Sequence, residues 1–151
     1  MIFIENTEDL SAFCQKLAEK PFIAVDTEFI RERSFYPKLC LIQVAAEGIE
    51  GIIDPKAKGI NLEPFFDLLQ NESVMKVFHA CSQDVEIFFL LTGSVPKPLF
   101  DTQIAAMVCS MGTRMSDSFK DYLRPLVQGE VKLVYKDGIA PVSNFKRIKV
   151  K

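Results

Sequence analysis

The sequence lacks several features that would assign it quickly to a protein class. It has no Trp, a single His and four Cys, and none of the cysteines belongs to a Cys-x-x-Cys motif. This scarcity argues against a zinc site, and scattered cysteines are typical of reduced thiols in a cytoplasmic protein. The formal net charge is only -2, so the overall charge does not indicate a nucleic-acid binder, although a local patch can still bind one.

Long apolar runs are also missing. No stretch approaches the roughly 20 apolar residues that cross a bilayer, so we expect no membrane span. The opening residues have no basic segment followed by a long apolar one, so we expect no signal peptide. The 151 residues, 48% of them hydrophobic, are enough for one domain with one sizeable core. We therefore expect a cytoplasmic globular domain of unknown oligomeric state.

Five short apolar segments are predicted as strands of one sheet. Residues 1–5 are expected at its edge. The segments 22–28, 38–46 and 49–53 are expected to run antiparallel to one another. The segment 74–79 is expected to run parallel to 22–28, which makes the sheet a mixed one.

Four segments have the spacing of helices, at 7–19, 62–70, 82–91 and 101–111. The first is expected to begin with Thr7 as its capping residue. Because helices and strands alternate after the initial antiparallel strands, the pattern predicts an α/β fold. Its mixed sheet is expected to carry helices on both faces.

The pattern changes after Met111. Residues 112–151 hold polar runs, two apolar clusters and a basic end, and their helical and strand periods are weak. We predict a domain over 1–111 and a divergent, poorly packed tail over 112–151. The apolar clusters at 131–135 and 139–142 are expected to pair as a hairpin.

Three carboxylates fall where the chain leaves the predicted core. Asp26 and Glu28 end a buried strand and, being two residues apart, project to the same side of it. Asp84 lies early in the helix that follows the 74–79 strand, and such strand-to-helix turns gather at one edge of a sheet. Like charges this close resist ionisation unless a cation lies between them, and Mg²⁺ or Mn²⁺ is expected for oxygen-only ligands. The alternatives are a solvent-facing acidic pair and an Asp favoured by the helix dipole.

A basic and aromatic segment follows the first two carboxylates. It holds the cations Arg31, Arg33 and Lys38 and the aromatic Tyr36. Such a set fits a surface that contacts phosphates and stacks against a base, and the alternative is an exposed polar loop. The single histidine, His79, stands at a strand end, where a structural role is the favoured interpretation.

Together these segments resemble the ribonuclease D branch of the four-carboxylate 3′→5′ exonucleases. The first matching string is 24–44, which joins Asp-Thr-Glu to the basic and aromatic segment. The second is 76–88, with an Asp at the family's metal position, and a third is 98–106, where the resemblance gives Asp101 a structural role. The resemblance covers residues 1–111.

The resemblance implies a ribonuclease H-like sheet between helices and a site for two divalent ions, Mg²⁺ or Mn²⁺. It makes Asp26, Glu28 and Asp84 the metal ligands and catalytic residues. The ions would activate a water and stabilise the leaving 3′ oxygen. The implied reaction releases nucleoside monophosphates from single-stranded RNA 3′ ends, above all those of tRNA precursors.

The chain departs from this family at a late Tyr-x-x-x-Asp motif, which supplies the fourth ligand and the Tyr that orients the attacking water. Four residues after Tyr36, Tyr122 and Tyr135 stand Cys40, Leu126 and Ile139. The fold is therefore expected to be incomplete at its C-terminus. A change of reading frame would explain the tail, because reading 130–149 one base later with ordinary codons can give family-like residues.

Three functions follow from these observations. The first is a metal-dependent 3′→5′ exoribonuclease that is impaired in this chain. The second is a non-catalytic nucleic-acid-binding relic of such an enzyme. The third is a structural or partner-binding fragment without a nucleic-acid role.

Overall fold

The computed structural model describes residues 1–32, 36–108, 133–135 and 138–140. The chain divides into two compact units, Met1–Asp101 and Thr102–Lys151. In the second unit the described elements are α4 (Thr102–Val108) and an antiparallel pair, β7 (Leu133–Tyr135) with β8 (Gly138–Ala140). The hairpin predicted from the two apolar clusters is thus confirmed. The predicted division at residue 111 falls among residues that the structure does not describe, and it stays a prediction.

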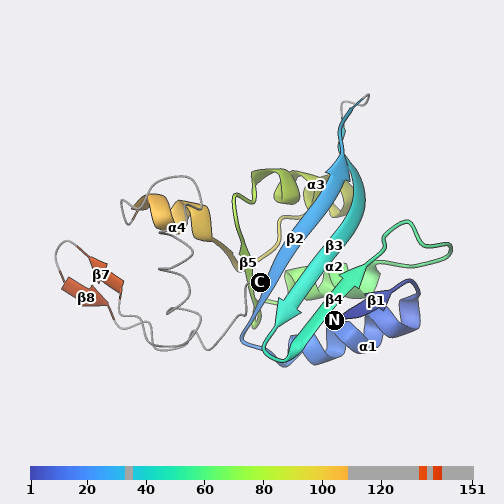
Figure 1. The fold of residues 1–151 in the computed structure, drawn as a ribbon, viewed down its shortest axis with the longest axis horizontal. Coiled ribbons are helices and arrows are strands. Elements are labelled where there is room, and N and C mark those ends of the chain that lie inside the picture. The colour runs from blue at the N-terminus through green and yellow to red at the C-terminus, as the bar shows by residue number, and fades with distance from the viewer. Residues whose placement is uncertain (33–35, 109–132, 136–137, 141–151) are drawn as a thin grey trace. The chain divides into compact units, whose positions relative to one another are not determined.

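The first unit is built on a six-stranded sheet with the order β1-β4-β3-β2-β5-β6 (Figure 1). Its strands are β1 (Ile2–Ile4), β2 (Phe22–Ile30), β3 (Lys38–Ala46), β4 (Ile49–Ile53), β5 (Met75–Phe78) and β6 (Leu99–Asp101). The pairs β2–β3 and β3–β4 are antiparallel, whereas β1–β4, β2–β5 and β5–β6 are parallel. This confirms the mixed sheet, the edge position of β1 and the parallel placement of β5. The strand β6 was not among the predicted strands, because its three residues follow Pro98 and reach the start of the predicted helix over 101–111.

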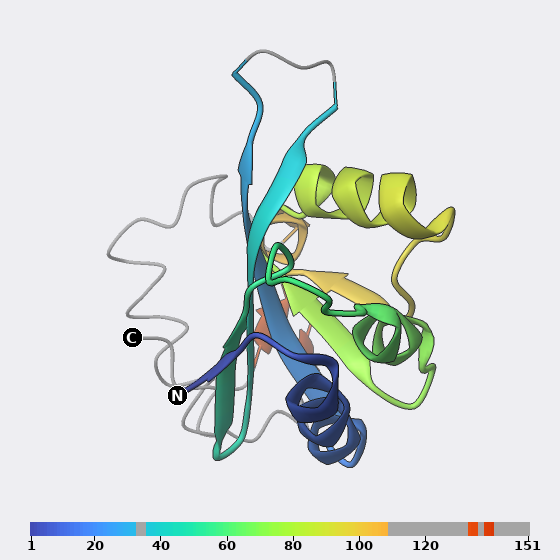
Figure 2. The ribbon, with the colours of Figure 1, turned by 90° about the vertical axis from the view of Figure 1, so that its right-hand side faces the viewer.

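Three helices of this unit, α1 (Thr7–Ala18), α2 (Glu63–Gln70) and α3 (Ser82–Thr92), lie on one face of the sheet (Figure 2). The ring of Phe88 on α3 lies 5.9 Å from the ring of Phe65 on α2 and 6.3 Å from that of Phe78 on β5, measured between centroids. These contacts place the core between the helices and the sheet. Helices on the second face stay a prediction, because α4 belongs to the other unit. No helix in the described ranges is long and apolar enough to cross a membrane.

The start of α1 differs from the prediction. Asn6 is the capping residue, and its side-chain oxygen accepts a hydrogen bond from the backbone N–H of Asp9 at 2.9 Å. Thr7 is instead the first helical residue, and its hydroxyl oxygen accepts from the backbone N–H of Asn61 at 2.8 Å. The prediction was wrong by one residue because Asn and Thr are both favoured caps.

β2 extends beyond the strand beside it, β5, and so leaves one of its edges open to other contacts. β2 has nine residues but pairs with β5 only through Phe22, Ile23 and Ala24. Its second half stays paired with β3 on one side. On the other side, no strand within the described residues continues the ladder. The N-terminal part of α3 contacts this edge of β2 instead.

Candidate metal centre

Two of the three predicted carboxylates share one face of β2. Asp26 and Glu28 are exposed, and Thr27 between them is buried at 7% exposure. This alternation follows from the pleat of a strand, in which successive side chains point to opposite faces. The prediction that Asp26 and Glu28 project to the same side therefore agrees with the exposure of both residues and the burial of Thr27.

The third carboxylate is carried by the first turn of α3. Asp84 is buried, at 7% exposure, and it is the acidic residue of that turn. Its hydrogen-bond partner is Thr27, whose hydroxyl donates to the Oδ1 atom of Asp84 at 2.5 Å. Asp84 thus lies along the part of β2 that does not pair with β5, beside the residue between Asp26 and Glu28.

The electrostatics of Asp84 reflect this position. Burial raises the pKa of its carboxyl above the ordinary value, and the hydrogen bond from the Thr27 hydroxyl opposes that rise. The negative charge of Asp26 raises the pKa further. Asp26 and Asp84 therefore interact across the edge of β2, as like charges do when no cation lies between them.

The helix that carries Asp84 begins at a constrained turn. Ala80 has a φ of 56°, in the left-handed region that a residue with a Cβ seldom adopts. Asp101, the last residue of β6, holds this turn: its carboxylate accepts from the backbone N–H groups of Ala80, at 3.0 Å, and Cys81, at 2.9 Å. These bonds agree with the structural role that the sequence assigned to Asp101. Through them, β6 fixes where α3 starts and hence where Asp84 lies.

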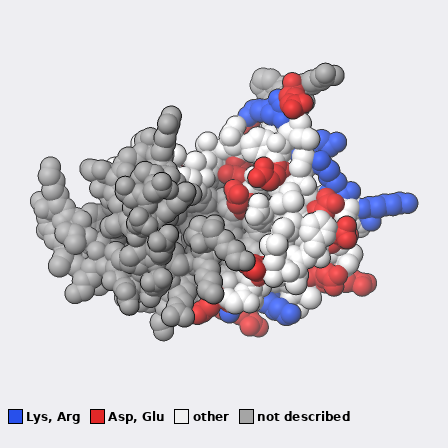
Figure 3. Space-filling view, viewed as in Figure 1, with Lys and Arg blue, Asp and Glu red and all other residues white. Residues whose placement is uncertain are grey.

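Asp84 is close enough to feel the charge of Asp26, and Glu28 is exposed on the same face of β2 as Asp26. In the part of the chain that the structure describes, no group of three His, Cys, Asp or Glu side chains is arranged to hold a metal ion. Figure 3 shows acidic side chains gathered over β2 and α3, with basic ones towards the tip of the β2–β3 hairpin. Carboxylate oxygens are the ligands that Mg²⁺ and Mn²⁺ prefer, and the repulsion between Asp26 and Asp84 is what such an ion would relieve. The donors therefore fit a hard divalent cation in chemistry.

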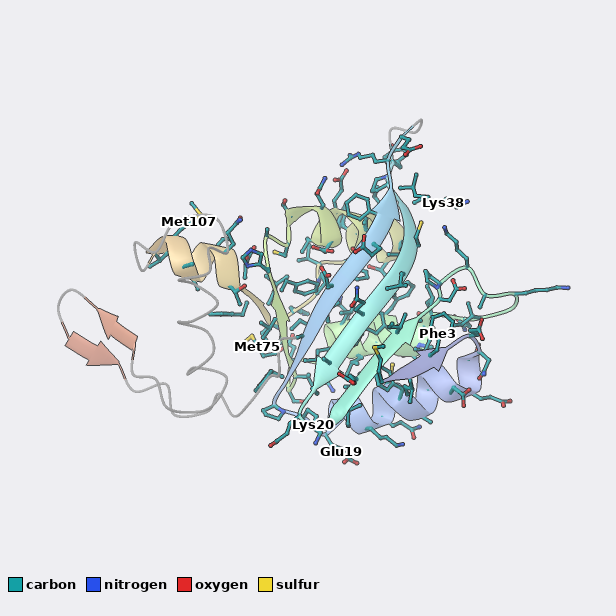
Figure 4. All side chains as sticks on the ribbon, in the orientation of Figure 1. Phe3, Glu19, Lys20, Lys38, Met75 and Met107 are labelled. Atoms are coloured by element: carbon teal, nitrogen blue, oxygen red, sulfur yellow. The ribbon has the colours of Figure 1, made fainter. Side chains whose placement is uncertain are left out.

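The predicted basic and aromatic segment leaves the sheet at the end of β2. Arg31 forms a forked ion pair with Glu86 of α3, with Nη2 to Oε1 at 2.8 Å and Nη1 to Oε2 at 3.1 Å. Tyr36 is exposed, and so is Lys38, at the hairpin end of β3 (Figure 4). Arg33 lies outside the described residues. Sequence reasoning missed Glu86, because 55 residues separate it from Arg31 and no local pattern joins them.

His79, the single histidine, directly follows β5 and is half-buried. Thr27 is the other residue whose part in the site the sequence did not reveal. Its signal was available in the alternation of β2, which turns the residue between two exposed carboxylates towards the helices. A hydroxyl at that position is the donor that a buried carboxylate needs.

Comparison with known proteins places this chain in a family. The family model described as 3'-5' exonuclease matches residues 1–148. Ribonuclease D of Jannaschia sp. is 51% identical over 116 residues, which are 74% of this chain and 30% of that protein. Ribonuclease D of Sphingobium indicum is 54% identical over 113 residues, again 74% of this chain and 29% of that protein.

A solved structure agrees. Escherichia coli RNase D, described as an exoribonuclease involved in structured RNA processing, has a TM-score of 0.73 and 36% identity, covering 80% of this chain and 32% of that one. The chain thus spans about a third of the length of the relatives it matches. The family is metal-dependent. The chain belongs to the 3′→5′ exonuclease family, where it is similar to the N-terminal part of ribonuclease D.

Proposed function

We propose that this chain carries the metal-binding part of a 3′→5′ exoribonuclease that removes nucleoside monophosphates from RNA 3′ ends. The observation that carries the proposal is the position of Asp84. Its carboxylate accepts a hydrogen bond from Thr27 of β2. Thr27 stands between Asp26 and Glu28, which are exposed on one face of the strand. Membership of the exonuclease family supports the same activity.

Asp26, Glu28 and Asp84 are the proposed ligands and catalytic residues, for Mg²⁺ or Mn²⁺. Bound divalent ions would supply the activation of a water and the stabilisation of the leaving oxygen. The chain's own residues orient this site. Thr27 holds the Asp84 carboxylate against β2, and Asp101 holds the start of α3.

The proposed substrate is single-stranded RNA with a tRNA-like 3′ end. Arg31, Arg33 and Lys38 would contact phosphates, and Tyr36 would stack against a base. A guanidinium has five N–H donors, so Arg31 can contact a phosphate while it remains paired with Glu86. The E. coli relative, an exoribonuclease of structured RNA processing, supports this class of substrate.

The cytoplasm is the proposed compartment. Cys14, Cys40 and Cys81 are free thiols in the described part of the chain. Thiols stay reduced in the cytosol, whereas oxidising compartments favour disulfides. A cytoplasmic location would also give the protein access to tRNA precursors.

A non-catalytic relic that still binds nucleic acid is the second candidate. The sequence has no Tyr-x-x-x-Asp, so the family's fourth ligand and its water-orienting Tyr are missing. The loss of one transition-state interaction commonly lowers kcat by about 10²–10³. Two such losses in one site should leave little turnover, so we expect weak cleavage at best.

The test is a 3′-end degradation assay on single-stranded RNA with Mg²⁺ or Mn²⁺, comparing the 151-residue chain with Asp26→Ala. Slow cleavage that Asp26→Ala abolishes would support the exonuclease. RNA binding that weakens with salt, without any cleavage, would support the relic. Brisk cleavage abolished by Asp26→Ala would contradict the expected impairment, and neither binding nor cleavage would overturn the proposed function.

A further inference from the structure

Two polar links of different character join α3 to β2 and the residue after it. One is the buried hydrogen bond between Thr27 and Asp84, and the other is the half-exposed ion pair between Arg31 and Glu86. Asp84 and Glu86 lie in the first half of α3, Thr27 lies in the second half of β2, and Arg31 directly follows β2. On this side of β2 the register with β5 ends at Ala24, so the Thr27 link stands where a ladder of backbone hydrogen bonds would otherwise run.

The Arg31–Glu86 pair has the geometry of an orienting contact. Both terminal nitrogens of Arg31 meet both carboxylate oxygens of Glu86, at 3.1 and 2.8 Å. A planar fork of this kind fixes direction as well as distance, which a single Lys–Glu contact does not. Glu86 follows Asp84 by two residues on the same helix, so the fork restrains the turn of α3 that carries Asp84.

We propose that Arg31 and Glu86 are positioning residues that hold α3 against β2 and thereby set Asp84 beside Asp26. This inference rests on the proposed function for its catalytic consequence, but the positioning itself does not require a metal. An exposed ion pair contributes little to global stability. Its removal should therefore loosen the β2–α3 contact without unfolding the chain.

The backbone N–H of Thr27 reports this contact, because the hydroxyl of the same residue donates to the Asp84 carboxylate. We expect Arg31→Gln and Glu86→Gln each to speed hydrogen exchange at this amide by about two- to fivefold, the factor that the loss of an exposed ion pair corresponds to. The charge swap R31E/E86R should restore slow exchange. Amides of the β3–β4 ladder should not change.

Glu72→Gln is the matched control, because it removes another exposed ion pair, with Lys97 at 2.9 Å, and Glu72 precedes β5 whereas α3 follows it. It should leave the Thr27 amide unchanged. An unchanged Thr27 amide in both Arg31→Gln and Glu86→Gln would overturn the proposal and leave Arg31 as a phosphate contact alone. Acceleration that the charge swap does not reverse would also count against it.

Titration of Mn²⁺ into the same variants, without RNA, separates this inference from the proposed function. If the wild-type chain binds Mn²⁺, Arg31→Gln and Glu86→Gln should weaken the affinity to a similar extent, and the charge swap should recover it. If the wild-type chain binds no Mn²⁺, the proposed metal site fails. The exchange of the Thr27 amide would then still decide whether the ion pair positions α3.

Discussion

Lys76 is a charged residue of β5 that is completely buried. Its ammonium group donates to the backbone carbonyls of Asn71 and Val74, both at 2.7 Å. Burial lowers its pKa from 10.5 to about 8, and the nearby charge of Glu72 opposes this change. At neutral pH the folded chain therefore keeps the Lys76 ammonium group charged, although its burial favours the neutral amine.

We expect this residue to make the protein more stable at alkaline pH. Between pH 8 and 10.5 the unfolded chain binds the Lys76 proton and the folded chain has released it, so the free energy of unfolding rises with pH. The rise is at most about 3 kcal/mol, because one pKa unit corresponds to about 1.4 kcal/mol. Urea denaturation from pH 7 to pH 10 measures it, with Lys76→Met as reference. Equal pH dependence in both proteins would contradict the expectation.

The direction of a side chain could be predicted where the two-residue period of a strand determines it. The two-residue period of a strand puts Asp26 and Glu28 on one face, and their exposure agrees. The partners of Asp84 and Arg31 could not be predicted, because Thr27 and Glu86 are distant in sequence and the fold brings them close. Whether Asp26, Glu28 and Asp84 share a metal ion stays a prediction.

At the scale of elements, helix α1 packs tightly against the sheet at one position. An added Cβ on Gly51 of β4 would stand 2.7 Å from the Cζ atom of Phe13, which is 2% exposed. Real Cβ atoms do not approach so closely, so the Phe13 ring or the helix itself must move. Gly51 therefore sets the distance between α1 and the sheet.

Gly51→Ala should destabilise the protein by about 1–3 kcal/mol, the usual cost of overpacking a core. Chemical denaturation measures this change. In a Phe13→Leu background the same substitution should cost less, because the shorter side chain leaves room for the new methyl group. An equal cost in both backgrounds would mean that the ring does not cause the strain.

Most helices and strands were predictable, because the spacing of apolar residues in a long segment indicates whether it forms a helix or a strand. The strands over 22–28, 38–46 and 49–53 and the helices over 62–70 and 82–91 agree with the structure to within two residues. The exceptions are local. β6 was missed because its three residues follow Pro98 and reach the start of the predicted helix over 101–111. The cap of α1 is Asn6 and not Thr7, because two residues that are both favoured as caps stand side by side.

For the whole molecule, the site should make stability depend on divalent ions. A ligand that binds only the folded state stabilises it by about 2.7 kcal/mol at a hundredfold excess over Kd. For a chain of this size that corresponds to a rise in Tm of several degrees. We expect Mn²⁺ to raise the Tm of the wild-type chain and to leave Asp26→Asn nearly unchanged. An equal rise in both proteins would locate the ion elsewhere.

The bond between Asp101 and the start of α3 has a consequence for the order in which the site is made. The ribosome adds Asp26, Glu28 and Asp84 before it adds Asp101, since synthesis runs from the N-terminus. Until β6 joins β5, the turn at Ala80 lacks the carboxylate that accepts its backbone N–H. The nascent chain therefore contains the three acidic residues before it contains the carboxylate that fixes the start of α3, so Asp84 can take its final position only after residue 101 has been added.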